Sequence, residues 1–173
     1  MAVIIRQRRV EPDSWLLLKP AADASIAIPP AGDVIVPLAA WREQRAALLA
    51  RTGRLGVWLE STDDPARIAG DLQHFALIAV NFPQFTDGRG YSIARLLRER
   101  YRWQGELRAV GDVLRDQLFY LSRCGFDAFA LRAGEDAQSV LAAFDDFSEG
   151  YQTSVERPQP LFRRRSQAAP DRA

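Results

Sequence analysis

Short apolar segments alternate with helical segments along most of this chain, and this alternation limits the fold more than any other feature. From residue 33 onward, apolar runs at 33–37, 56–60, 75–80, 106–110 and 126–131 are each followed by a segment with helical spacing. Strands that alternate with helices favour right-handed crossovers and a parallel sheet. The sequence therefore predicts an α/β fold of repeated strand–helix units with a mainly parallel sheet. A partial (β/α) barrel and a flavodoxin-like open sheet both fit this pattern.

Three regions of the chain differ in character. Residues 1–32 form an irregular N-terminal segment in which short apolar runs predict short strands. Residues 33–150 hold the alternation and are predicted to form one α/β domain. Residues 151–173 contain three prolines and an arginine triplet but few large apolar side chains, so a flexible arginine-rich tail is predicted there.

The supply of metal-binding side chains is very small. Cys124 is the only cysteine and His74 the only histidine, so the chain cannot form an internal disulfide. It also cannot provide the four thiolates that commonly hold an iron–sulfur cluster, or the ligands of a His/Cys zinc site. Neither a GxxxxGK[ST] phosphate loop nor a GxGxxG fingerprint is present. We therefore expect no cofactor and no metal in this chain, and any redox cofactor is expected to come from a partner.

Charge and hydropathy indicate a cytoplasmic protein. No apolar run approaches the ~20 residues that span a membrane, and arginines follow the first four apolar residues after Met1, unlike a secretory signal. No membrane association is expected. The net charge of +1 gives no support for a nucleic-acid partner. Since 22 of the 23 basic residues are arginine, an arginine indicates an anion site only where its position supports one.

The loop Asp87-Gly88-Arg89-Gly90 follows the third predicted strand, on the side of the sheet where parallel α/β folds bind ligands. Gly88 and Gly90 permit positive φ angles and a close backbone approach. Ser92 is expected to cap the next helix, whose free N–H groups attract anions. Arg89 would add a two-pronged donor to an oxyanion, oriented by Asp87. An ordinary Asp-Gly turn followed by a capping serine explains the same residues without a ligand.

A second unusual feature is the charged face of the fourth predicted strand. Alternation places Glu106 and Arg108 on one face, whereas a central parallel strand is normally apolar on both. A buried Arg108 needs a partner, and Glu106 is the nearest candidate on that face. Arg108 is therefore either a second cation of the anion site or one half of a buried structural pair.

Four polar residues near predicted strand ends are secondary candidates for the site. Asp112 is most simply the N-cap of the following helix. Arg115 and Asp116 either reach the ligand-binding edge or form a surface pair worth little. The secondary candidates are Asn81, Asp112, Arg115 and Asp116.

Two long segments carry a resemblance to a known family. They read "NFPQFTDGRGYSIARLLRERY" and "GELRAVGDVLRDQLFYLSRCGFDAFALR". Both are similar to a bacterial family of unknown function whose members are named probable oxidoreductases involved in sulfite reduction. The similarity runs from about residue 33 to residue 147. It implies a role in assimilatory sulfate and sulfite reduction, and so in cysteine biosynthesis, alongside a sirohaem-containing sulfite reductase.

Two functions therefore follow from the sequence. The first is an accessory protein that docks on the sulfite reductase hemoprotein and helps electron delivery or assembly. The second is a small enzyme or sensor that binds an oxyanion through the Asp-Gly-Arg-Gly loop at the strand ends. The resemblance implies an oxidoreductase, whereas the chain has no visible cofactor motif, so no residue is assigned a catalytic role.

Overall fold

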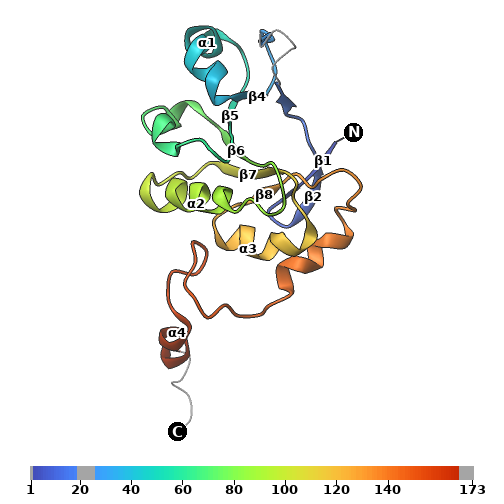
Figure 1. Ribbon diagram of the computed structural model, residues 1–173, viewed down its shortest axis with the longest axis vertical. Coiled ribbons are helices and arrows are strands. Elements are labelled where there is room, and N and C mark those ends of the chain that lie inside the picture. The colour runs from blue at the N-terminus through green and yellow to red at the C-terminus, as the bar shows by residue number, and fades with distance from the viewer. Residues whose placement is uncertain (1, 19–25, 168–173) are drawn as a thin grey trace.

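A computed structural model describes residues 2–18 and 26–167 and shows a curled, mainly parallel sheet, as predicted. Its eight strands lie in the order β2-β1-β8-β7-β6-β5-β4-β3 (Figure 1). From β3 to β8 each strand pairs in parallel with its successor in the sequence, whereas β1 pairs antiparallel with both β2 and β8. This sequential order is that of a half-barrel, because a flavodoxin-like sheet interchanges its first two strands. The strands are β1 (Val3–Arg6), β2 (Arg9–Pro12), β3 (Leu16–Leu17), β4 (Val34–Pro37), β5 (Leu55–Leu59), β6 (Leu77–Phe82), β7 (Glu106–Gly111) and β8 (Ala128–Phe129).

Several helices differ from the predicted ones. The helix expected at 61–72 is replaced by two short 3₁₀ turns at 65–68 and 72–74, and the last predicted helix is also 3₁₀. The helix after β6 begins as α-helix and continues as a π-helix turn. The helical elements are α1 (Leu38–Ala50), η1 (Pro65–Ile68), η2 (Leu72–His74), α2 (Arg89–Arg95), η3 (Leu96–Arg100), η4 (Arg115–Gln117), α3 (Leu118–Arg123), η5 (Ser139–Asp145) and α4 (Leu161–Gln167).

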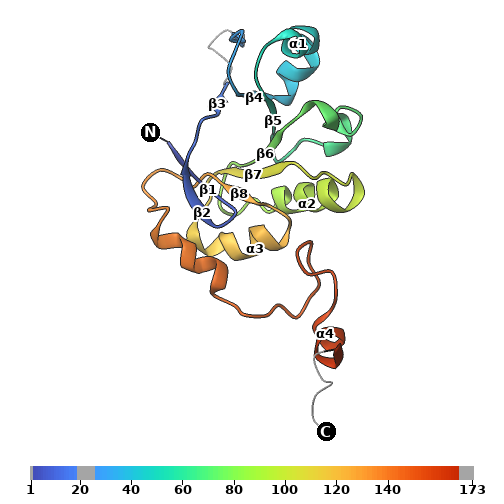
Figure 2. The ribbon, with the colours of Figure 1, turned by 180° about the vertical axis from the view of Figure 1, so that it is seen from behind.

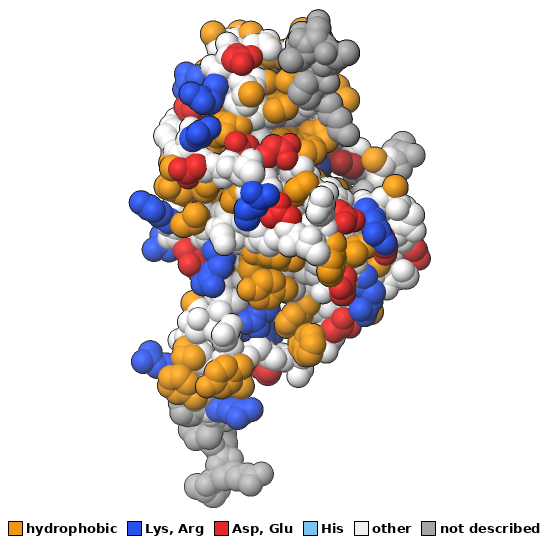
Figure 3. All heavy atoms as spheres, viewed as in Figure 1, with side chains coloured by type: hydrophobic (Ala, Val, Ile, Leu, Met, Phe, Trp, Pro, Cys, Tyr) orange, Lys and Arg blue, Asp and Glu red, His pale blue; other side chains and the backbone are white. Residues whose placement is uncertain are grey.

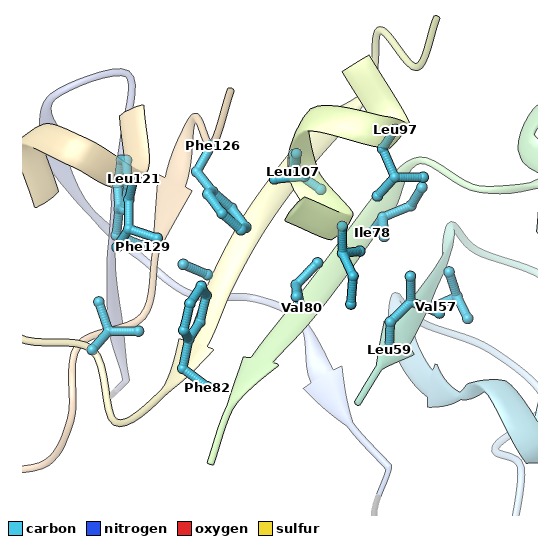
Figure 4. Close-up of a cluster of buried hydrophobic side chains, with 14 of the residues drawn as sticks. Val57, Leu59, Ile78, Val80, Phe82, Leu97, Leu107, Leu121, Phe126 and Phe129 are labelled. Carbon is cyan, nitrogen blue, oxygen red and sulfur yellow. The ribbon is translucent and has the colours of Figure 1, made fainter. Parts of the chain in front are cut away.

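The main core lies between the sheet and its helices. Along β6 the side chains alternate, so that Ile78, Val80 and Phe82 face the helices while Leu77 and Ala79 face the other way. Figure 4 shows the helix-side residues of β5 to β8 meeting Leu97 of η3 and Leu121 of α3. Side chains of α1, α2 and α3 share this one cluster, as expected when every crossover has the same hand.

The opposite, concave face holds a smaller cluster that includes Trp15 and Ile35. Arg108 of β7 is buried there, with 2% of its side chain exposed. It donates to Glu106 at 2.9 Å, as predicted, and also to Asp13 at 2.9 Å, which the sequence analysis did not anticipate. The N-terminal segment thus provides strands β1 to β3 of the sheet. It also provides Asp13, a counter-ion for the buried Arg108.

The chain leaves the half-barrel after η5. Residues 148–167, which we call the arm, extend away from the sheet and end in α4 (Figures 1 and 2). A backbone hydrogen bond from Val155 N to Arg123 O holds the arm against the end of α3 at 3.1 Å. Among the described residues, no helix has the length and apolar character needed to cross a membrane.

Candidate functional site

The carboxyl edge of the parallel strands brings together polar side chains from β5, β6 and the loops that follow them. Glu60, directly after β5, accepts a hydrogen bond from Trp58 Nε1 at 2.7 Å through Oε1. Its second oxygen accepts from Asn81 Nδ2, also at 2.7 Å. Asn81, a secondary candidate, is therefore part of this edge. Glu60 and Trp58 were not among the sequence candidates, although the position of Glu60 at a strand end was a usable signal.

Asp87 and Arg89 form the centre of the predicted loop. Arg89 forms a bidentate pair with the Asp87 carboxylate: Nε donates to Oδ1 at 2.9 Å and Nη2 donates to Oδ2 at 2.6 Å. Ser61 Oγ also donates to Oδ2, at 2.7 Å. The hydrogen bonds from Arg89, and then that from Ser61, hold the pKa of Asp87 well below its usual range. Asp87 orients the arginine as expected, but it also engages two of the nitrogens that an anion would use.

The positive φ angles predicted for Gly88 and Gly90 are wrong, and so is the capping role predicted for Ser92, whereas the close approach is present at Gly90. Helix α2 begins at Arg89, so Ser92 lies inside the helix and cannot be its N-cap. Gly88 occupies the cap position with φ −83°, and Gly90 is also not in the left-handed region. Gly90 is required for the close approach, since an added Cβ would lie 2.6 Å from Phe82 Cζ. It lets α2 approach β6 closely.

A shallow hollow of about 460 Å³ opens beside this loop. Arg89 lines it with 59% of its side chain exposed, and three hydroxyl groups share the lining. The nearby carboxylates of Asp63 and Asp64 accept from the backbone N–H groups of Glu60 and Ala66. The full lining is Ser61, Thr62, Asp63, Asp64, Pro65, Arg89, Ser92, Ile93 and Leu96. The hollow thus offers the hydroxyls of Thr62 and Ser92 and the unpaired end of one guanidinium.

The model of one protein family, described as "Bacterial protein of unknown function (DUF934)", matches residues 56–162. The chain belongs to this family. The DUF934 match covers well over half of the chain, including the Asp87 loop, β7 and most of the arm. No curated protein matches the chain.

Within the DUF934 region, the remaining secondary candidates do not converge on the hollow. Asp112 is not a helix cap, because η4 begins only at Arg115; instead its Oδ2 accepts from Phe85 N at 2.9 Å and fixes the Asp87 loop from the other side. Arg115 pairs with Asp146 at 2.8 Å rather than with Asp116. Asp116 is exposed within η4.

Arg108 also lies apart from the hollow. It sits in the middle of β7, buried on the concave face and paired with Glu106 and Asp13. This geometry favours the structural alternative over a role as a second cation. No group of three or more His, Cys, Asp or Glu side chains that could hold a metal ion occurs within residues 2–18 and 26–167.

Proposed function

We propose that this protein is a cytoplasmic accessory component of assimilatory sulfite reduction that docks on a sirohaem sulfite reductase hemoprotein. The resemblance of the 81–101 and 105–132 segments suggests the pathway. The observation that carries docking is the arm, which extends away from the half-barrel (Figures 1 and 2). The arm also exposes large aromatic side chains.

The arm has the composition of a binding segment. Tyr151 and Phe162 have relative exposures of 87% and 69%, unusually high for large rings. In Figure 3, hydrophobic and basic side chains lie together at this end of the molecule. Aromatic residues and arginine are enriched in protein interfaces, and α4 carries Phe162 beside the triplet Arg163, Arg164 and Arg165. A partner with an acidic surface and apolar pockets would suit this segment.

In this proposal the redox cofactor belongs to the partner. One cysteine and one histidine cannot supply the ligands of an iron–sulfur cluster. The purified protein is therefore expected to be colourless. An absorption band in the visible range that persists through purification and denatures with the protein would contradict this part of the proposal.

Co-migration on a sizing column, at micromolar concentration, tests docking. The protein is expected to elute with the sulfite reductase hemoprotein and to change its turnover. Replacing both exposed rings of the arm, Tyr151→Ser with Phe162→Ser, is expected to abolish both effects. Leu49→Ser, on the exposed side of α1, is the matched control and should leave them intact. Separate elution of the two wild-type proteins with unaltered turnover would overturn the proposal.

The hollow at the Asp87 loop favours a second candidate function, binding of a small oxyanion such as sulfite by an enzyme or sensor. Nη1 of Arg89 has no partner among the described residues, and the hydroxyls of Ser61, Thr62 and Ser92 line the same hollow. Calorimetry with sulfite and sulfate tests this function. Arg89→Ala is expected to abolish binding while Arg95→Ala, which removes a surface pair with Glu99, leaves it unchanged. Equal affinities in wild type and Arg89→Ala would exclude the loop as the site.

A further inference from the structure

A second hollow lies at the opposite, amino-terminal edge of the parallel strands, where the arm meets the half-barrel. Its volume is about 250 Å³. Four separate parts of the chain line it: the β1–β2 turn, α3, the end of η5 with the residues after it, and the first half of the arm. Three of its lining residues are arginines and three are phenylalanines: Arg8, Arg123, Arg157, Phe119, Phe144 and Phe147.

Each of the three arginines is anchored by some of its N–H groups only. Arg8 Nη1 donates to Asp145 at 3.0 Å, and Arg157 Nη1 donates to Glu149 at 3.0 Å. Arg123 Nη2 donates to a backbone carbonyl, that of Gln152, at 2.7 Å. The other terminal nitrogen of each side chain has no hydrogen bond to any part of the chain that the structure describes. The guanidinium groups are thus held in place, and each keeps one terminal nitrogen whose N–H groups can donate to a ligand.

Ion pairs account for only two of the three arginines. Arg8 pairs with Asp145, and Arg157 pairs with Glu149 beside the lining. Arg123 forms no ion pair with any described residue, and the hydrogen bond of its guanidinium goes to a backbone carbonyl. The half-buried Arg123 is therefore the cation that is left without a paired carboxylate.

Aromatic rings lie directly beside these cations. The guanidinium carbon of Arg8 is 5.3 Å from the ring centre of Phe144, and that of Arg123 is 5.7 Å from the ring centre of Phe119. The Phe119 and Phe147 rings are 5.1 Å apart, and Phe147 has a relative exposure of 63%. Planar guanidinium groups and aromatic faces both stack on flat ring systems. The hollow therefore offers stacking surfaces next to unused cationic donors.

The backbone on both sides of the hollow is adapted to close contact. A Cβ at Gly150 would overlap Nη1 of Arg123, so the glycine lets the arm cross the guanidinium in its present position, and any other residue would require the guanidinium to shift. On the other side, Gln7 and Arg8 both have positive φ, at 48° and 61°. Such a turn favours glycine and asparagine, so two long side chains there are an unusual choice. It directs Arg8 across the edge toward η5.

We propose that this hollow binds a small organic anion in which a planar ring carries a phosphate or sulfate group, in the size range of a mononucleotide. The ring packs against Phe119 and Phe147, and the anionic group accepts from Arg123 and Arg157. The volume of about 250 Å³ lies just below the range of small-molecule sites, which starts at about 300 Å³, so only a small ligand fits. Because Gly150 and Arg157 belong to the arm, the bound ligand also holds the arm against α3. Docking on a sulfite reductase does not require this site.

Calorimetry of the full-length protein with three probes tests the proposal: adenosine monophosphate, inorganic phosphate and adenosine. The first is expected to bind, and the other two at least about tenfold more weakly, because each lacks one half of the contacts. Arg123→Gln is expected to weaken binding of adenosine monophosphate by about tenfold or more. Gly150→Ala should do likewise, since it displaces the guanidinium without removing its charge. Arg42→Gln, an exposed arginine far from this edge, is the charge-matched control.

Three results would overturn the proposal. The first is that adenosine monophosphate gives no heat of binding. The second is that Arg123→Gln and Gly150→Ala both bind it as tightly as wild type. The third is that inorganic phosphate alone binds as tightly as adenosine monophosphate. Thermal unfolding of each variant checks that the fold is retained. Elution with sulfite reductase is measured without nucleotide, so failure of this proposal is distinguishable from failure of docking.

Discussion

Arg108 shows how much one buried charge depends on its surroundings. Its side chain is 2% exposed, and Asp13 and Glu106 are themselves largely buried beside it. Arg108→Leu removes the cation and leaves two carboxylates without their main partner, so we expect a loss of about 3 kcal/mol in the free energy of unfolding. Urea denaturation measures this loss. Arg95→Leu removes an exposed pair and should cost no more than about 0.5 kcal/mol. Equal losses for the two variants would contradict the structural role of Arg108.

The Asp87–Arg89 pair leads to a prediction about pH. The pKa of Asp87 is lowered first by Arg89 and then by Ser61, so Arg89→Gln should raise that pKa toward the ordinary value of about 4. Because the folded-state pKa is the lower one, the pair stabilises the fold above about pH 4, and this contribution is lost as the pH falls through the folded-state pKa. NMR titration of the Asp87 carboxyl measures the shift. Arg95→Gln should leave the titration unchanged, and an unaltered Asp87 pKa in Arg89→Gln would show that the pair is not formed in solution.

Sequence reasoning at the residue scale succeeded where the partner is close along the chain. Strand alternation placed Arg108 beside Glu106, two residues away, and the short loop placed Arg89 beside Asp87. It missed Asp13, which lies 95 residues from Arg108 and reaches it only because β1 and β8 pair. It predicted a close approach at Gly90 but not the group that is approached, since the contact with Phe82 exists only once α2 packs on β6.

At the scale of elements, the two glycines of the loop make a matched test of how α2 packs on β6. A methyl group at Gly90 would lie 2.6 Å from the buried Phe82 ring, whereas one at Gly88 would lie 3.8 Å from the nearest side chain. Gly90→Ala is therefore expected to lower the free energy of unfolding by about 1–3 kcal/mol, as overpacking does. Gly88→Ala should change it by less than about 0.5 kcal/mol. Chemical denaturation of both variants measures the difference. A larger loss for Gly88→Ala would restore the turn-based explanation of the loop.

The central strands were predictable and the helix expected at 61–72 was not, for a physical reason. Buried parallel strands are mostly apolar runs, so 56–60 and 75–80 identified β5 and β6 to within two residues. The segment 106–110 identified β7 equally closely although Glu106 and Arg108 interrupt its apolar character. The segment 61–72 has a capping aspartate and Pro65, which mark a helix start. Its buried residues are limited to Ser61, Pro65 and Ile68. A helix start with so small an apolar face does not extend beyond one turn.

On the scale of the whole molecule, the alternation predicted the parallel units but not how the sheet ends. The sequential strand order decides for a half-barrel, and no local pattern encodes that order. The antiparallel β1–β2 hairpin adds to β8 through only two residue pairs, Ile5 with Phe129 and Arg6 with Ala128. Such an edge depends on contacts across more than 120 residues, which local sequence patterns do not reveal.

This arrangement predicts opposite effects for removing the two ends of the chain. A chain that starts at residue 33 lacks β1 to β3 and the buried Trp15, so the remaining sheet carries an exposed edge. It also lacks Asp13, the ion-pair partner of Arg108, so the buried charge of Arg108 is poorly compensated. We expect it to be insoluble or to lack a cooperative unfolding transition. A chain that ends at residue 150 loses α4 and a few contacts with Arg123 but keeps every strand, so its cooperative transition should remain, with a midpoint lower by only a few degrees. Differential scanning calorimetry of the two truncated chains distinguishes these outcomes.

If the chain ending at 150 also fails to fold, the arm is part of the folding unit and not a separate docking segment. A stable chain starting at 33 would show that the Arg108 cluster tolerates the loss of its N-terminal carboxylate.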